Sequence, residues 1–175
     1  YGIFAGKTVV VVNIPIAIAS AVSTAMIPTI SGTFATGDME ATRDRVTLAI
    51  RTTMLIAIPS AVGMGVLARP IMMLLFPQRD SLDLASSLLQ ALSVSVVFYS
   101  LSTLTNAVLQ GIGRVNRPVI NAASALVLQT VVLIPLLIFT NFNQYCMVAA
   151  TIVYSLAMCV MNHHSVVRFL EYRQE

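Results

Sequence analysis

The sequence predicts an all-α protein, a multipass transmembrane helix bundle. Hydrophobic residues make up 57% of the 175 residues, charged residues only 10%, and the mean hydropathy is +0.86. This composition leaves too little polar surface to cover a soluble globule. Five apolar runs approach the length that crosses a bilayer, with short polar breaks between them. Most basic residues fall on every second break, as expected when the breaks alternate between two sides of a membrane.

The first two predicted helices cover about residues 8–30 and 46–68. At 100° per residue, Asn13, Ser20 and Thr24 fall on one narrow stripe of the first helix. These side chains are candidates for lining a cavity, although contact between helices is the more common role of small polar residues in membrane bundles. The polar connection between the two helices carries its acidic residues first, which is typical of a helix N-terminus.

A short apolar segment, 71–76, ends at a proline and is too short to span, so we expect it at the membrane interface. The third predicted helix, about 84–109, has the strongest polar stripe. Its members share one helical face: Ser95, Tyr99, Ser102, Thr103, Asn106 and Gln110. So many polar side chains on one face predict a wall that meets water or a polar substrate group.

A glycine-rich turn with two arginines organises the middle of the chain. Gly111 and Gly113 are predicted to form this structural turn, and Pro118 opens the next helix, where a missing backbone N–H does no harm. The last two predicted helices cover about 118–139 and 145–167, which completes five spans.

Lysine and arginine then predict the orientation. Seven of the ten belong to one side, namely the breaks near 32–45 and 111–117, the adjoining start of the second helix, and the C-terminal tail. Three belong to the other side. By the positive-inside rule the side with seven is predicted to be cytoplasmic.

Several classes of function are disfavoured. No acidic residue lies in the core of an apolar run and no phosphate-binding loop motif is present, so we expect no enzyme and no cofactor. The basic residues are explained by topology, so nucleic acid is not an expected partner. The adjacent His163 and His164 point about 100° apart on a helix, so no metal site is expected. Cys146 and Cys159 are too far apart on one helix for a disulfide.

Several short motifs, taken in order, resemble a known family. They are residues 1–7 (YGIFAGK), 13–15 (NIP), 26–28 (MIP), 57–63 (AIPSAVG), 74–77 (LLFP) and 109–114 (LQGIGR), followed by Pro118. Together they resemble the polysaccharide biosynthesis and lipid II flippase branch of the multidrug/oligosaccharidyl-lipid/polysaccharide exporter superfamily, and within it the stage V sporulation protein B-like forms.

The resemblance implies that residues 1–175 are a fragment of one transmembrane lobe, the second lobe of a two-lobed alternating-access transporter. The partners it implies are membrane lipid, the remaining helices of the same full-length protein, and a lipid-linked oligosaccharide or lipid II-like substrate. The chain is therefore predicted to belong to a flippase or exporter of a lipid-linked sugar or peptidoglycan precursor in the bacterial cytoplasmic membrane. A drug or cation antiporter of the same superfamily is one alternative. A membrane scaffold for wall or spore assembly, which transports nothing, is another.

Overall fold

A computed structural model describes residues 2–76, 81–139 and 143–171, and these residues form helices and short connections with no strand among them. A π-helical turn, η1 (Phe4–Thr8), leads into α1 (Val9–Ala35). The other helices are α2 (Met39–Val66), α3 (Ala68–Leu75), α4 (Leu82–Gly111), α5 (Asn116–Phe139) and α6 (Asn143–Glu171).

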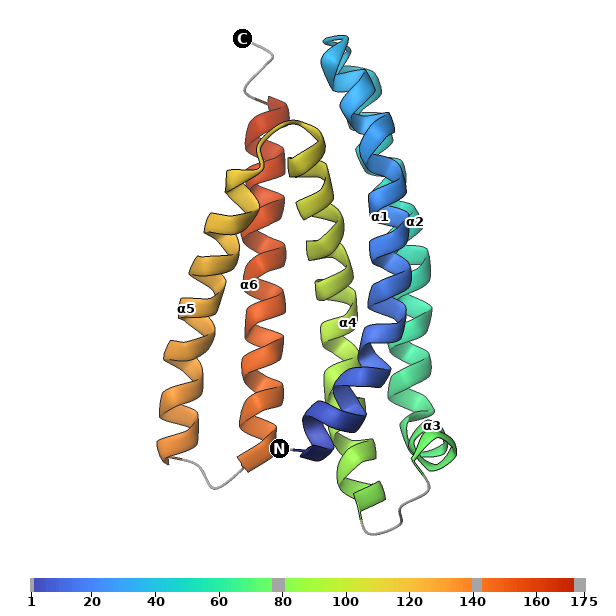
Figure 1. Ribbon diagram of the computed structural model, residues 1–175, viewed down its shortest axis with the longest axis vertical. Coiled ribbons are helices and arrows are strands. Elements are labelled where there is room, and N and C mark those ends of the chain that lie inside the picture. Colours follow the sequence, from blue (N-terminus) through green and yellow to red (C-terminus); the bar gives the residue numbers. More distant parts are fainter. Residues whose placement is uncertain (1, 77–80, 140–142, 172–175) are drawn as a thin grey trace.

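Within the described residues, five helices are long and apolar enough to cross a membrane, namely those of η1 with α1, α2, α4, α5 and α6. The fold class predicted from the sequence is thereby confirmed. Successive spans run in opposite directions, so the α1–α2 connection, the α4–α5 connection and the C-terminal end of α6 lie at the same end of the bundle (Figure 1). We call this the α6-terminal end. The π-helical turn η1, helix α3 and the C-terminal end of α5 lie at the other end (Figure 1).

Helix α4 is the centre of the bundle because it packs against α1, α2, α3 and α6. Two apolar clusters follow one another along it. Leu88, Leu89 and Leu92 belong to the first cluster, and Leu104 and Val108 belong to the second. Each cluster joins side chains of α1, α2, α4 and α6, so these four helices form one packed unit.

Helix α5 lies at the edge of the bundle (Figure 1) and packs mainly against α6. The apolar part of this contact is a small cluster in which Ala125 meets Ala157 and Met158. Much of its remaining surface is apolar and exposed, for example at Val127 and Ile138. Such a surface is what lipid or a further helix would cover.

The helices extend beyond the spans predicted from hydropathy. Helix α2 begins at Met39 and not near Val46, because the carboxylate of Asp38 accepts a hydrogen bond from the Ala41 backbone N–H at 2.9 Å and caps a polar first turn. The predicted interfacial segment 71–76 falls largely in α3. Since α3 carries exposed Met73, Leu74 and Leu75, it suits a position at the membrane surface.

Glycine has two distinct roles in this bundle. At Gly113 the backbone φ is +78°, a left-handed conformation that favours glycine and that turns the chain from α4 towards α5. At Gly65 of α2 a Cβ atom would lie 3.1 Å from the Ser93 hydroxyl oxygen of α4, so the missing side chain lets the two helices approach closely. Gly111 is the last residue of α4, and Pro118 lies buried in the first turn of α5.

Candidate functional site

The predicted polar stripe of α1 lies at the surface of the described helices. Asn13 and Thr24 are exposed and Ser20 is half-buried. The Thr24 hydroxyl donates to the Ser20 carbonyl oxygen at 2.9 Å, so its hydrogen bond stays within the helix. Ile14 and Ile18, beside this stripe, are also exposed. The exposed face of α1 therefore has one polar strip and one apolar strip.

The predicted polar stripe of α4, unlike that of α1, is partly buried between helices. Ser95 and Ser102 are buried, with 1% and 5% of their surface exposed. Tyr99 is 37% exposed and its ring lies 6.3 Å from the ring of Tyr154 on α6, between centroids. Gln110 is exposed at the α6-terminal end. The buried serines of this stripe are therefore closed off within the described helices, Thr103 and Asn106 are half-buried, and Tyr99 and Gln110 are its exposed members.

Three asparagines join α4, α5 and α6. The Asn162 side-chain nitrogen donates to the Asn106 side-chain oxygen at 2.7 Å and to the Ser102 carbonyl oxygen at 3.4 Å. The Asn121 side-chain nitrogen donates to the Asn162 side-chain oxygen at 2.8 Å and to the Ser165 hydroxyl at 3.2 Å. Asn162 is fully buried. We call Asn106, Asn121 and Asn162 the asparagine network; it fixes the relative rotation of the three helices.

A pocket of about 680 Å³ opens at the α6-terminal end, between the end of α1, the α4–α5 connection and the last turn of α6. Such a volume is typical of small-ligand sites, which are roughly 300 to 1,000 Å³. Its lining combines three arginines with three apolar side chains and a glycine, and we call it the arginine pocket. The lining residues are Phe34, Ile112, Gly113, Arg114, Arg117, Arg168 and Phe169.

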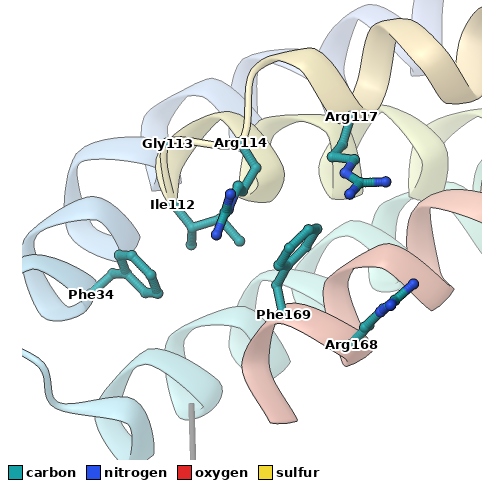
Figure 2. A pocket seen from close by; sticks show the side chains of 7 residues that line it. All are labelled: Phe34, Ile112, Gly113, Arg114, Arg117, Arg168 and Phe169. Atoms are coloured by element: carbon teal, nitrogen blue, oxygen red, sulfur yellow. The ribbon is translucent and has the colours of Figure 1, made fainter. Parts of the chain in front are cut away.

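Phe169 is the centre of the arginine pocket. Figure 2 shows its ring between Arg114 on one side and Arg117 and Arg168 on the other. The guanidinium carbon of Arg114 lies 4.7 Å from the ring centroid, and that of Arg117 lies 5.4 Å from it. Both distances are those of cation–π interactions. One ring therefore holds two positive charges close together at the mouth of a pocket.

A smaller hollow of about 210 Å³ adjoins the arginine pocket and shares Arg117, Arg168 and Phe169 with it. Asn121 and Ser165 also line this hollow, so it extends to the edge of the asparagine network. On the other side, an Arg43 guanidinium nitrogen donates to the Leu170 carbonyl oxygen at 3.1 Å. This bond ties the start of α2 to the last turn of α6.

Sequence reasoning found the two arginines of the turn but missed the pocket they form. Phe34 and Phe169 are single aromatic residues near the ends of apolar runs, and no local pattern distinguishes them. The only available signal was an aromatic residue directly after Arg168, close to the end of the last run. Within the described ranges no group of three or more His, Cys, Asp or Glu could hold a metal ion.

The five apolar helices define a multipass membrane protein. A family model described as lipid II flippase MurJ matches residues 7–171, and the chain belongs to this family. The branch suggested by the sequence motifs is thereby confirmed. The description of this family model, a flippase, is that of a transporter.

A curated relative agrees with this placement. The chain is 28% identical over 128 residues to the lipid II flippase MurJ of Bacillus subtilis (strain 168). The matched part is 72% of this chain but only 23% of the relative, so the chain spans about a quarter of that protein's length. No solved structure matches the chain.

Proposed function

We propose that this chain is part of a flippase that moves a lipid-linked cell-wall or polysaccharide precursor, such as a lipid II-like molecule, across the bacterial cytoplasmic membrane. The observation that carries this proposal is the match of the MurJ family model to residues 7–171. The described helices support it because they combine several spanning segments with polar strips inside the span.

The proposed path for the polar part of the substrate runs along the accessible members of the predicted stripes. Asn13, Ser20 and Thr24 line it on α1, and Tyr99 and Gln110 line it on α4. An exposed asparagine in a membrane span is unfavourable against lipid, so this face of α1 suits a water-filled cavity or the remaining helices of the full-length protein. The buried Ser95 and Ser102, and the bonded Asn106, contribute to packing between α4 and its neighbours.

The proposed path is tested by placing a large side chain at one of the residues that line it. Ser20→Trp in the complete protein is expected to abolish growth of a flippase-depleted strain, because a large ring narrows a cavity at a half-buried position. Ile18→Trp is the matched control, since Ile18 is exposed on the neighbouring apolar strip of the same helix and is expected to support growth. Both variants are compared at equal membrane abundance. Equal growth of the two variants would place the path elsewhere.

The proposed orientation places the α6-terminal end in the cytoplasm, because seven of the ten basic residues belong to that side. Single cysteines at Thr36 and Val115 should be protected from an impermeant thiol reagent in intact cells. A cysteine at Gln78, which lies outside the described residues, should be labelled. The opposite labelling pattern would reverse the orientation.

The flippase function itself is tested by supplying the complete protein to a strain depleted of its own lipid II flippase. Restored growth, together with the appearance of lipid II on the outer face in a protection assay, is the expected result. Correctly inserted protein that restores neither would contradict the proposed function.

A further inference from the structure

The arginine pocket is separate from the polar strips of α1 and α4 that the proposed transport path uses. We propose that this pocket binds the phosphate group of an anionic glycerophospholipid in the leaflet at the α6-terminal end of the bundle. This inference rests on the described helices spanning a membrane; it does not depend on what the complete protein transports.

The charges of the pocket favour a phosphate. Arg114 and Arg117 are exposed, and in the part of the chain that the structure describes neither is in an ion pair. Both lie over the same ring, so their positive charges repel each other until an anion enters. Guanidinium groups bind phosphate oxygens through two parallel N–H donors.

Phe169 orients these donors. A guanidinium group that interacts with the face of a ring keeps its N–H edges free, so the cation–π contacts at 4.7 and 5.4 Å restrict both side chains without consuming their hydrogen bonds. Less side-chain entropy is then lost when a phosphate binds. The ring therefore preorganises the two guanidinium groups for binding an anion.

The position of the pocket favours a lipid as the source of that phosphate. The candidate spans end at Ala35, Gly111 and Leu170, next to the lining residues Phe34, Ile112 and Phe169. Lipid headgroups lie at the ends of transmembrane helices, and basic pockets between such ends bind anionic headgroups. The apolar side chains of the lining would contact the glycerol and the first acyl carbons, which a free phosphate lacks.

The test uses the purified complete protein in detergent, with bound lipid counted by native mass spectrometry during titration. Phosphatidylglycerol is the probe; phosphatidylcholine, inorganic phosphate and undecaprenyl pyrophosphate are the comparison ligands. The test variant is R114Q/R117Q, and R114K/R117K is the conservative variant. R45Q is the matched control, because Arg45 is an exposed arginine at the same end that does not line the pocket.

We expect R114Q/R117Q to weaken phosphatidylglycerol binding at least about tenfold, since two charge-assisted contacts are lost. R114K/R117K should recover part of the affinity, and R45Q should stay within about twofold of the unchanged protein. F169L should weaken binding by about threefold while both charges remain. If R114Q/R117Q is not recovered as folded protein, the single variants R114Q and R117Q are each expected to weaken binding by about threefold, half of the free-energy loss of the double variant.

Four results would overturn the inference. One is undiminished phosphatidylglycerol binding by R114Q/R117Q. A second is an equal loss in R45Q, which would mean general attraction to a basic end. A third is a lack of selectivity for the anionic lipid, seen either as its displacement by equimolar inorganic phosphate or as equal binding of phosphatidylcholine. The fourth is a loss confined to undecaprenyl pyrophosphate, which would assign the pocket to the transported substrate.

Discussion

Removing the central amide of the asparagine network is expected to destabilise the bundle by about 2 kcal/mol. Asn162 is fully buried, and Asn162→Leu keeps the branched shape of the side chain with slightly larger groups, so the change removes hydrogen bonds and leaves no cavity. Two short bonds are lost, at 2.7 Å to Asn106 and 2.8 Å from Asn121. Such bonds between membrane helices contribute on average ~0.6 and at most ~1.7 kcal/mol each.

The size of this destabilisation depends on the hydrogen-bond partners that Asn106 and Asn121 keep in the variant. Asn121 keeps its bond to the Ser165 hydroxyl at 3.2 Å, so its amide stays partly satisfied. The network contributes no other partner for the Asn106 side-chain oxygen, which becomes a half-buried acceptor without a donor. A loss of about 2 kcal/mol corresponds to roughly a thirtyfold change in the unfolding equilibrium.

The measurement is the free energy of unfolding of the complete protein in mixed micelles, obtained by titration with a denaturing detergent. Ser124→Ala is the control, because among the described residues its exposed hydroxyl donates only to the Ile120 carbonyl oxygen of its own helix. A double-mutant cycle with Asn106→Leu should give a coupling energy of about 1 kcal/mol. A coupling below about 0.3 kcal/mol, or a stabilised Asn162→Leu, would refute the view that these amides hold α4, α5 and α6 together.

Three further substitutions test local geometry. Gly113→Val should lower the amount of folded protein in the membrane, because a β-branched residue at φ +78° costs about 1–3 kcal/mol. Gly113→Asn should have a smaller effect, since asparagine tolerates this conformation better. Membrane abundance, measured with a fluorescent fusion, tests both expectations. Gly65→Val should destabilise by about 1–3 kcal/mol through contact with Ser93, and Ser93→Gly in the same chain should restore part of the thermal stability. Asp38→Ala should cost about 1 kcal/mol through loss of the helix cap, measured by the same detergent titration.

Most of the fold could be predicted from hydropathy because a bilayer requires long, continuous apolar helices. The helix starts could be predicted less well. Hydropathy marks where a helix leaves the membrane but not where it begins in water, so the polar first turns of α2, from Met39, were assigned to a connection. The positive φ at Gly113 was predictable, because a glycine followed by arginine and a helix-opening proline indicates a turn.

The predicted stripes could be located but their partners could not. The spacing of Ser102 and Asn106 places them on one face of α4, as the sequence indicates. Nothing local to that helix says that Asn162, far along the chain, lies opposite this face and bonds to both. The arginine pocket was missed for the same reason, since Phe34 and Phe169 meet Arg114 only through the arrangement of helices distant in sequence.

The edge position of α5 also bears on the order in which the membrane bundle is assembled. Both partners of the Asn121 amide belong to α6, which the ribosome makes after α5. Among the described helices, α5 packs mainly against α6, so this amide lacks both of these partners until α6 enters the bilayer. Within the described bundle, we therefore expect α5 to dock only after α6 has been synthesised, so that these two helices join the bundle together.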